Sequence, residues 1–127
     1  MAKKELIILD TDILIEIIRK NITVIQKCDR MGTEKLAISS ISFNEFLAGS
    51  RNKEDLQRNI KFLTGFKLVP VNRNIDRLFT ELYKTYAISH RPGIPDMLIA
   101  ATSLHYNYAV YTNNKKHFRF IPGIRLV

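Results

Sequence analysis

A run of four apolar residues, Leu6 to Leu9, ends abruptly at Asp10, and this transition constrains the fold more than any other feature of the chain. The run is uninterrupted and partly β-branched, whereas a half-exposed strand would alternate apolar and polar residues. It predicts a strand that is buried on both faces, as in a parallel sheet covered by helices. The chain is therefore expected to adopt an α/β fold.

Short apolar segments alternate with helical patterns along the rest of the chain. Segments 36–38, 67–71 and 109–111 predict three more strands, 124–127 is a candidate fifth, and Pro70 places 67–71 at an edge of the sheet. Apolar residues at helical spacing predict helices at 13–18, 22–30, 42–49, 56–63, 73–88 and 95–106. This alternation predicts a three-layer α/β/α fold with a central parallel sheet of four to five strands. Residues 1–127 are expected to form a single domain.

The net charge of +8 lies entirely in the later part of the chain. Basic and acidic residues balance over residues 1–50, whereas residues 51–127 hold thirteen bases and five acids. A basic surface favours a polyanionic partner such as nucleic acid, although the same charge can serve solubility alone. The lone Cys28 is typical of a reducing cytoplasm, and the apolar run before Asp10 is too short for a signal peptide or a membrane span.

Three acidic residues that are far apart in sequence each stand beside an apolar stretch. Asp10 follows the first strand, Glu45 lies shortly after the second, and Asp96 opens the last helix. Ligands of parallel sheets bind beyond the carboxyl ends of the strands, so this fold permits the three carboxylates to meet. A buried carboxylate is costly unless a cation or hydrogen bonds compensate it. Three that converge would form a hard-oxygen site for Mg²⁺ or Mn²⁺.

Each of these acids also has a purely structural explanation. Asp12 is a candidate N-cap of the first helix, and Ser42-x-x-Glu45 has the spacing of a capping box, which is the favoured explanation of Glu45 taken alone. Asp96 in a first helical turn gains about 0.5 kcal/mol from the helix dipole. For Asp96 the sequence favours neither the structural nor the functional explanation over the other. Acids at both 10 and 12 exceed what one cap requires, which favours a functional role for Asp10.

The polar segment 112–118, Thr-Asn-Asn-Lys-Lys-His-Phe, is either an ordinary turn after a strand or part of a site. As a site it offers a hydroxyl, amides, an imidazole and lysines that can bind phosphate. His90 and His105 have no partner at a metal-binding spacing and are expected to be structural or on the surface. The sequence contains no glycine-rich phosphate loop, no Cys-x-x-Cys pair and no Ser/His/Asp order.

Four segments together resemble the PIN-domain ribonucleases, and within them the VapC-like toxins of prokaryotic toxin–antitoxin pairs. They are LDTDILI at 9–15, SSISFNE at 39–45, GIPDMLIAA at 93–101 and YTNNKKHF at 111–118, the last followed by IPGIRL at 121–126. Each segment is weak evidence alone, but four in this order within 127 residues are specific. The resemblance spans nearly the whole chain.

The resemblance implies a PIN-like fold and a metal-dependent endoribonuclease that hydrolyses RNA phosphodiester bonds. Asp10 and Asp96 would bind Mg²⁺ or Mn²⁺, and Glu45 would complete the site by orienting the attacking water. The ion would polarise a phosphoryl oxygen and lower the pKa of a bound water.

Further residues would support this site. The resemblance implies that Asp12, Thr112 and His117 stabilise the ligands by hydrogen bonds, and that Asn114 helps to orient the water. The chain departs from the family at its last acidic position, where family members often carry Asp or Glu and this sequence has Asn114 and His117. The departure bears on whether a second metal ion binds.

The expected partners follow from the resemblance and from the surface charge. Arg91, Lys115, Lys116 and Arg119 would bind RNA phosphates, with an affinity that falls steeply as salt rises. VapC-like proteins usually form homodimers and are neutralised by a small antitoxin whose tail inserts near the active site. A cytoplasmic protein with no membrane association is expected.

Three alternatives stay open at the level of sequence. The missing fourth acid is compatible with a weakened PIN-like protein that binds RNA or an antitoxin but no longer cuts. Asp10-x-Asp12 after a strand is also found in phosphatases of the haloacid-dehalogenase kind, where Asp10 would be the nucleophile and Asp12 a general acid. A purely structural interaction module would tolerate Asp10→Asn without any loss of activity.

Overall fold

The computed structural model describes residues 5–127, and its elements alternate as the sequence predicts. They are β1 Ile7–Leu9, α1 Thr11–Ile18, α2 Ile22–Met31, β2 Leu36–Ser39, α3 Ser40–Ala48, α4 Lys53–Leu63, β3 Lys67–Val69, α5 Arg73–Tyr86, α6 Ile94–Tyr106 and β4 Ala109–Tyr111. Two single-turn 3₁₀ helices, Thr33–Lys35 and Lys115–His117, precede β2 and follow β4. No helix in this part of the chain is long and apolar enough to cross a membrane.

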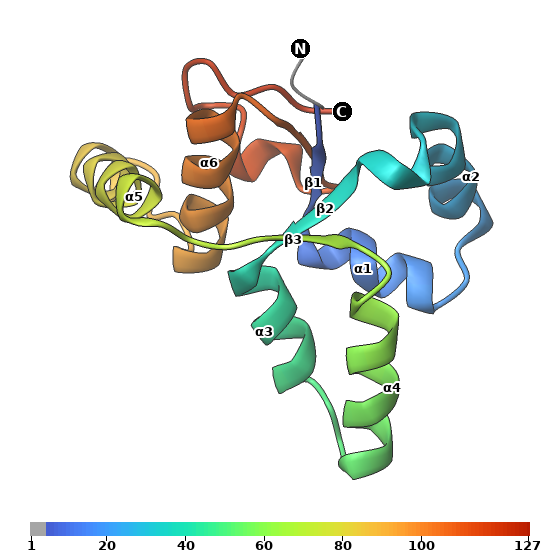
Figure 1. Ribbon diagram of the computed structural model, residues 1–127. Helices are drawn as coiled ribbons and strands as arrows, with labels where there is room; N and C mark the ends of the chain where they lie inside the picture. Colours follow the sequence, from blue (N-terminus) through green and yellow to red (C-terminus); the bar gives the residue numbers. More distant parts are fainter. Residues whose placement is uncertain (1–4) are drawn as a thin grey trace.

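The strands form one parallel sheet in the order β3-β2-β1-β4 (Figure 1). β1 is an interior strand, in which Ile8 pairs with Ala37 on one side and with Val110 on the other. β3 lies at an edge, as predicted from Pro70. The candidate fifth strand at 124–127 is reduced to a single parallel bridge between Leu126 and Val110, which is closed by two backbone hydrogen bonds of 2.9 Å and follows a left-handed turn at Gly123 (φ +82°).

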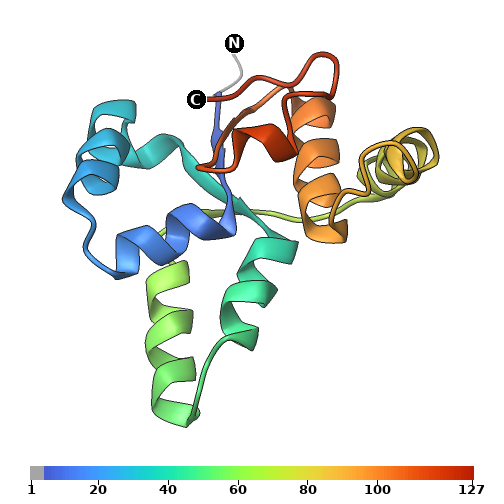
Figure 2. The ribbon, with the colours of Figure 1, turned by 180° about the vertical axis from the view of Figure 1, so that it is seen from behind.

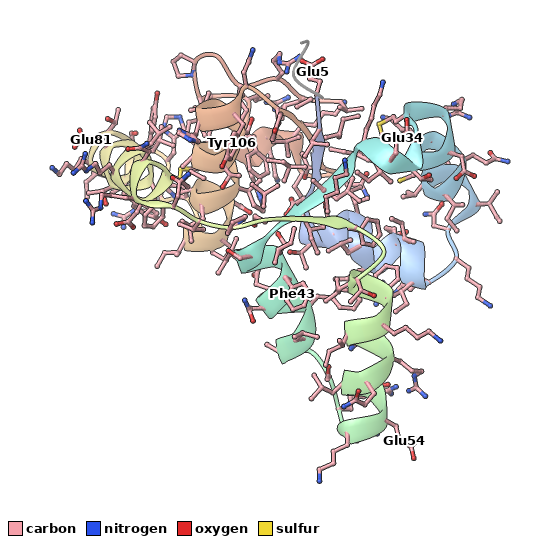
Figure 3. All side chains as sticks on the ribbon, in the orientation of Figure 1. Glu5, Glu34, Phe43, Glu54, Glu81 and Tyr106 are labelled. Carbon is pink, nitrogen blue, oxygen red and sulfur yellow. The ribbon has the colours of Figure 1, made fainter. Side chains whose placement is uncertain are left out.

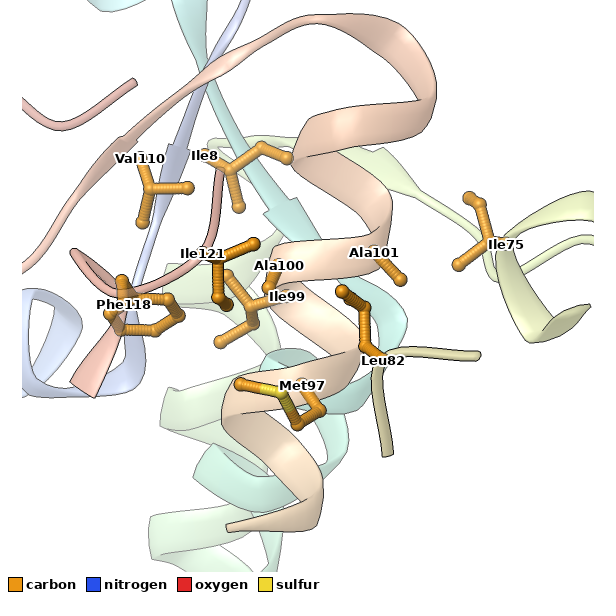
Figure 4. Packing of buried hydrophobic residues seen from close by; sticks show 10 residues of the cluster. All are labelled: Ile8, Ile75, Leu82, Met97, Ile99, Ala100, Ala101, Val110, Phe118 and Ile121. Carbon is orange, nitrogen blue, oxygen red and sulfur yellow. The ribbon is translucent and has the colours of Figure 1, made fainter. Parts of the chain in front are cut away.

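Each face of the sheet has its own hydrophobic core, because neighbouring residues of a strand point to opposite sides. Ile8 belongs to the core beneath α5 and α6, where it is buried with Met97 and Phe118 (Figure 4). Leu9 belongs to the other core, which α1 and α2 cover through Ile13 and other apolar residues. Helices therefore cover both faces, and the three-layer α/β/α prediction is confirmed.

α3 and α4 form a hairpin that projects away from the layers (Figure 2). Phe62 joins the two helices, since its ring lies 5.4 Å from that of Phe46 on α3 and 5.4 Å from that of Phe66 after α4. Phe43 lies on α3, and Glu54 lies toward the far end of α4 (Figure 3). Leu63 of α4 and Phe46 of α3 join the core beneath α1 and α2, so the base of the hairpin is packed against the layers while its far end projects.

The helices that follow β1 and β2 begin earlier than predicted, because each starts directly where its strand ends. The N-cap of α1 is Asp10 rather than Asp12: Oδ1 of Asp10 accepts a hydrogen bond from the Thr11 amide at 2.8 Å. The N-cap of α3 is Ser39, whose hydroxyl accepts from the Ser42 amide at 3.3 Å. The capping box predicted for Ser42 and Glu45 is therefore wrong, and the Glu45 carboxylate serves another contact.

Candidate active site

The carboxyl ends of the interior strands bring the predicted acids to one edge of the sheet. Asp10 directly follows β1, Glu45 lies in the helix that follows β2, and Thr112 directly follows β4. Asp96 lies in the first turn of α6, next to the segment after β4, where it contacts His117. This is the location at which parallel α/β sheets bind their ligands.

Asp10 is buried and held in one orientation from both sides of the sheet edge. It is 7% exposed, its Oδ1 accepts the Thr11 amide, and its Oδ2 accepts the Thr112 hydroxyl at 2.8 Å. The Thr112 hydroxyl also accepts a hydrogen bond from the Asn114 amide at 2.9 Å. The turn after β4 thus fixes the carboxylate that ends β1, 102 residues earlier in the chain.

Glu45 reaches the same edge from α3. Its Oε1 accepts a hydrogen bond from the Thr11 hydroxyl at 3.0 Å. Thr11 therefore contacts two carboxylates, through its amide to Asp10 and through its hydroxyl to Glu45. Sequence reasoning did not predict this role, although a hydroxyl residue between Asp10 and Asp12 was the available signal.

Asp96 lies among like charges and one counter-ion. Its pKa is raised, first by burial and then by the negative charge of Asp10, with a further contribution from Glu45. His117 opposes this rise, since its Nδ1 lies 3.2 Å from Oδ2 of Asp96 and forms an ion pair when the imidazole is protonated. The charges of Asp10 and Glu45 therefore act on the Asp96 carboxyl group at this edge of the sheet.

Asp12 connects α1 to the turn after β4. Its Oδ2 accepts hydrogen bonds from the Asn113 amide at 3.0 Å and from the Asn114 side-chain amide at 3.2 Å. Its Oδ1 is buried and has no hydrogen-bond partner. Burial, followed by the charge of Asp10, raises the pKa of Asp12 from 3.8 to about 6. Asp12 therefore adds a fourth carboxylate, at the side of the site where Asn114 stands.

The group fits a divalent cation in its chemistry. Among residues 5–127, no three Asp, Glu, His or Cys side chains are placed so as to hold one metal ion in this arrangement. The donors are nevertheless hard oxygens, the ligands that Mg²⁺ and Mn²⁺ prefer. The raised pKa values of Asp12 and Asp96, and the orphaned Oδ1 of Asp12, are what a cation among these carboxylates would offset.

The four basic residues predicted to bind RNA are all exposed, but they do not form one cluster. Arg91 and Lys116 line a cleft together with Asp96. Lys115 lines a different cleft, between α2 and the turn after β4. Arg119 lies on the surface after the 3₁₀ helix. Two of the four thus share a cleft with one of the predicted metal ligands, Asp96.

The PIN-domain family model matches residues 7–122, which cover nearly the whole chain. The fold, the sheet-edge carboxylates and this match agree, and the chain belongs to the PIN-domain family. The family predicted from the four sequence segments is confirmed. This membership leaves the phosphatase alternative without support.

Within the family the chain is similar to VapC ribonucleases. It is 33% identical over 116 residues to Ribonuclease VapC1 of Methanocaldococcus jannaschii, an alignment that covers 88% of this chain and 78% of the relative. It is 30% identical over 131 residues to the tRNA(fMet)-specific endonuclease VapC of Salmonella typhimurium, covering 93% of each.

Solved structures with the same fold include toxin–antitoxin complexes. The DNA-bound VapBC complex from Salmonella typhimurium superposes with a TM-score of 0.83 at 25% identity, covering 97% of both chains. A toxin–antitoxin complex from Klebsiella pneumoniae gives a TM-score of 0.78 at 27% identity, covering 94% of both chains.

Proposed function

We propose that this protein is a metal-dependent endoribonuclease and the toxin of a toxin–antitoxin module of the VapBC type. The observation that supports the proposal is the placement of three acids from separate elements at one edge of the sheet: Thr11 donates hydrogen bonds to both Asp10 and Glu45, and the charges of these two raise the pKa of Asp96. The names of the relatives, VapC ribonuclease and endonuclease, support cleavage of RNA as the activity.

Asp10 and Asp96 are the proposed ligands of Mg²⁺ or Mn²⁺. Such an ion, when bound, supplies charge stabilisation for the phosphoryl group during hydrolysis. The two hydrogen bonds on Asp10 orient its carboxylate before any ligand arrives, which lowers the cost of organising the site. His117 lowers the pKa of Asp96 and so favours the ionised form that a cation needs.

Glu45 is the proposed group that orients the attacking water and accepts its proton. One oxygen is held by the Thr11 hydroxyl, so the carboxylate has a defined direction toward the site. Asn114 is proposed to help orient the water, and Asp12 holds the Asn114 side chain through its amide. Asp12 and Thr112 therefore act by positioning the turn 112–114 against the end of β1.

The exposed Arg91, Lys115, Lys116 and Arg119 are proposed to bind the phosphates that flank the cleaved bond. A chain with a net charge of +8 attracts a polyanion from a distance, and the attraction weakens as salt rises.

A small antitoxin protein is the proposed regulatory partner, as in the similar toxin–antitoxin complexes. A cleft of about 430 Å³ between α1 and the α3–α4 hairpin supports this, because it joins apolar Ile15, Ile18 and Phe46 to Glu45 of the site. A homodimer in the cytoplasm completes the proposal. Exposed Leu68 at the edge strand β3 supports self-association, and the lone cysteine suits that compartment.

The experiment that tests the activity is cleavage of structured RNA by the purified protein with Mn²⁺, with EDTA, and by Asp96→Asn with Mn²⁺. Asp76→Asn is the matched control, because Asp76 also stands in the first turn of a helix, α5, but is exposed and remote from the site. Cleavage is expected only for the wild type and Asp76→Asn with Mn²⁺. Equal cleavage in all reactions, or none in any, would reject the proposed activity.

A weakened protein that binds RNA or an antitoxin without cutting is the second candidate. The specific observation in its favour is that Asn114 and His117 occupy the family's last acidic position. Calorimetric titration with Mn²⁺ separates the two functions, because a site that has lost its chemistry would show no binding at millimolar metal.

A further inference from the structure

Asp96 also lines a second cleft, of about 350 Å³, between the loop that joins α5 to α6 and the segment 116–120. The cleft is therefore continuous with the carboxylate site but extends away from Asp10 and Glu45, neither of which lines it. His90 and Arg91 come from the loop, and Lys116 and Phe120 come from the segment after β4, with the rings of His90 and Phe120 in direct contact. A volume of this size lies within the range of small-ligand sites.

An aromatic platform forms part of this cleft. The His90 ring stacks on Phe120 with centroids 4.1 Å apart and planes inclined by 15°. Tyr86 packs edge-on against both rings, at 5.4 Å from His90 and 5.0 Å from Phe120. Nδ1 of His90 is hydrogen-bonded to the Ser89 hydroxyl at 2.8 Å. The imidazole is thus held flat while His90 as a whole is exposed.

The backbone of this loop is held in an uncommon conformation. Arg91 has φ +44°, in the left-handed region that few non-glycine residues adopt. The next residue is tied down, because the Tyr83 hydroxyl of α5 donates a hydrogen bond to the carbonyl oxygen of Pro92. Such strain persists only where the surroundings enforce it, and it is often found at ligand sites.

The charges of the cleft match a nucleotide. Arg91 and Lys116 are exposed cations, and Asp96 is the only acid among the residues that line the cleft within the described chain. Cations bind phosphate, and a flat aromatic ring stacks on a base of any identity. The same two cations would repel a positively charged arginine side chain from a partner protein, which makes such a side chain an unfavourable occupant of the cleft.

We propose that this cleft is a nucleotide subsite, in which a base of single-stranded RNA adjacent to the cleaved bond stacks on His90 while Arg91 and Lys116 bind its phosphate. The inference rests on the proposed ribonuclease function and adds a base contact to it. It assigns a role to His90, which the sequence alone indicated to be structural or on the surface.

The test measures RNA binding without cleavage, by fluorescence anisotropy in EDTA. The probes are a labelled single-stranded RNA decamer of mixed sequence and the same decamer with every base removed. The variants are His90→Ala, His90→Phe, Lys116→Ala and the matched control His105→Ala, which removes another exposed histidine at the far end of α6.

His90→Ala is expected to weaken binding of the intact decamer about tenfold and to leave the abasic decamer unchanged. Lys116→Ala is expected to weaken both, and His90→Phe and His105→Ala neither. If His90→Ala fails to fold, the wild type still tests the subsite, because equal affinities for the intact and the abasic decamer would overturn it.

A decamer affinity that is unchanged by His90→Ala, or an equal loss for the intact and abasic decamers, would overturn the subsite. Failure of the ribonuclease proposal is read separately, as absence of cleavage when Mn²⁺ is added to the wild type. The base-dependent binding in EDTA would persist in that case.

Discussion

The Asp12 carboxylate is expected to cost folding stability at neutral pH when no cation is present. Burial and then the charge of Asp10 raise its pKa from 3.8 to about 6. A shift of about two pKa units corresponds to roughly 3 kcal/mol between the folded and unfolded states. Because Asp12 is only half-buried, screening by water reduces the expected cost to about 1–2 kcal/mol.

Asp12→Asn is therefore expected to raise the free energy of unfolding by about 1 kcal/mol at pH 7.5 in EDTA, and Tm by about 3–5 °C. The Asn side-chain oxygen can still accept the Asn113 backbone amide and the Asn114 side-chain amide, and its nitrogen takes the position of Oδ1, which has no hydrogen-bond partner in the carboxylate either. The folded-state pKa is raised, so the wild-type carboxyl group favours folding below pH 3.8 and this contribution is lost as pH rises through 6. The gain from Asp12→Asn should thus fall to about a third at pH 4.5.

The assay is urea denaturation of both proteins at pH 4.5 and 7.5 in EDTA, followed by circular dichroism. Asp29→Asn is the control, because Asp29 is an exposed acid on α2, and it should change stability by less than about 0.5 kcal/mol at either pH. Lower stability of Asp12→Asn than of the wild type at both pH values would refute the reasoning. The hydrogen bonds of the carboxylate would then outweigh its desolvation.

Three further substitutions test the contacts around the site. Thr112→Val removes the hydroxyl that donates to the buried Asp10 and should cost about 1–3 kcal/mol in urea denaturation, whereas Thr112→Ser should retain most of the stability. Phe118→Ala empties a fully buried position between the sheet and α6 and should cost about 3–5 kcal/mol in the same assay. His117→Ala should raise the pKa of Asp96 further, measured by NMR titration of its carboxyl carbon; an unchanged value would show that the ion pair is not formed.

Most of the fold could be predicted because buried strands and helix faces appear in this sequence as apolar runs and apolar residues at helical spacing. The run that ends at Leu9 is apolar without interruption since Ile8 and Leu9 enter separate cores on opposite faces of the sheet. Helix starts were less predictable, because Ser39 and Ser42 are equally good capping residues by type. Ser39 is the N-cap of α3 because β2 ends at this residue. The end of β2 depends on tertiary structure and cannot be predicted from the local sequence.

The positions of site residues could be predicted from the sequence where the end of a strand determines them. Asp10 and Glu45 follow β1 and β2, whose carboxyl ends lie at the same edge of the sheet, so topology alone brings these two to one edge. Asp96 opens α6, a position that permits the same edge but does not require it. The contact of Thr11 with Glu45 and of Asp12 with Asn114 could not be predicted, because each depends on side-chain directions across 34 and 102 residues of sequence. The roles assigned to these residues in catalysis stay predictions.

Calorimetric titration of Mn²⁺ into the wild type, Asp10→Asn, Asp96→Asn and the remote control Asp76→Asn tests most directly whether these acids share a cation. The account predicts saturable binding to the wild type and to Asp76→Asn, with binding weakened at least tenfold in each of the other two. Identical isotherms for all four proteins, or no binding to the wild type at millimolar Mn²⁺, would contradict it.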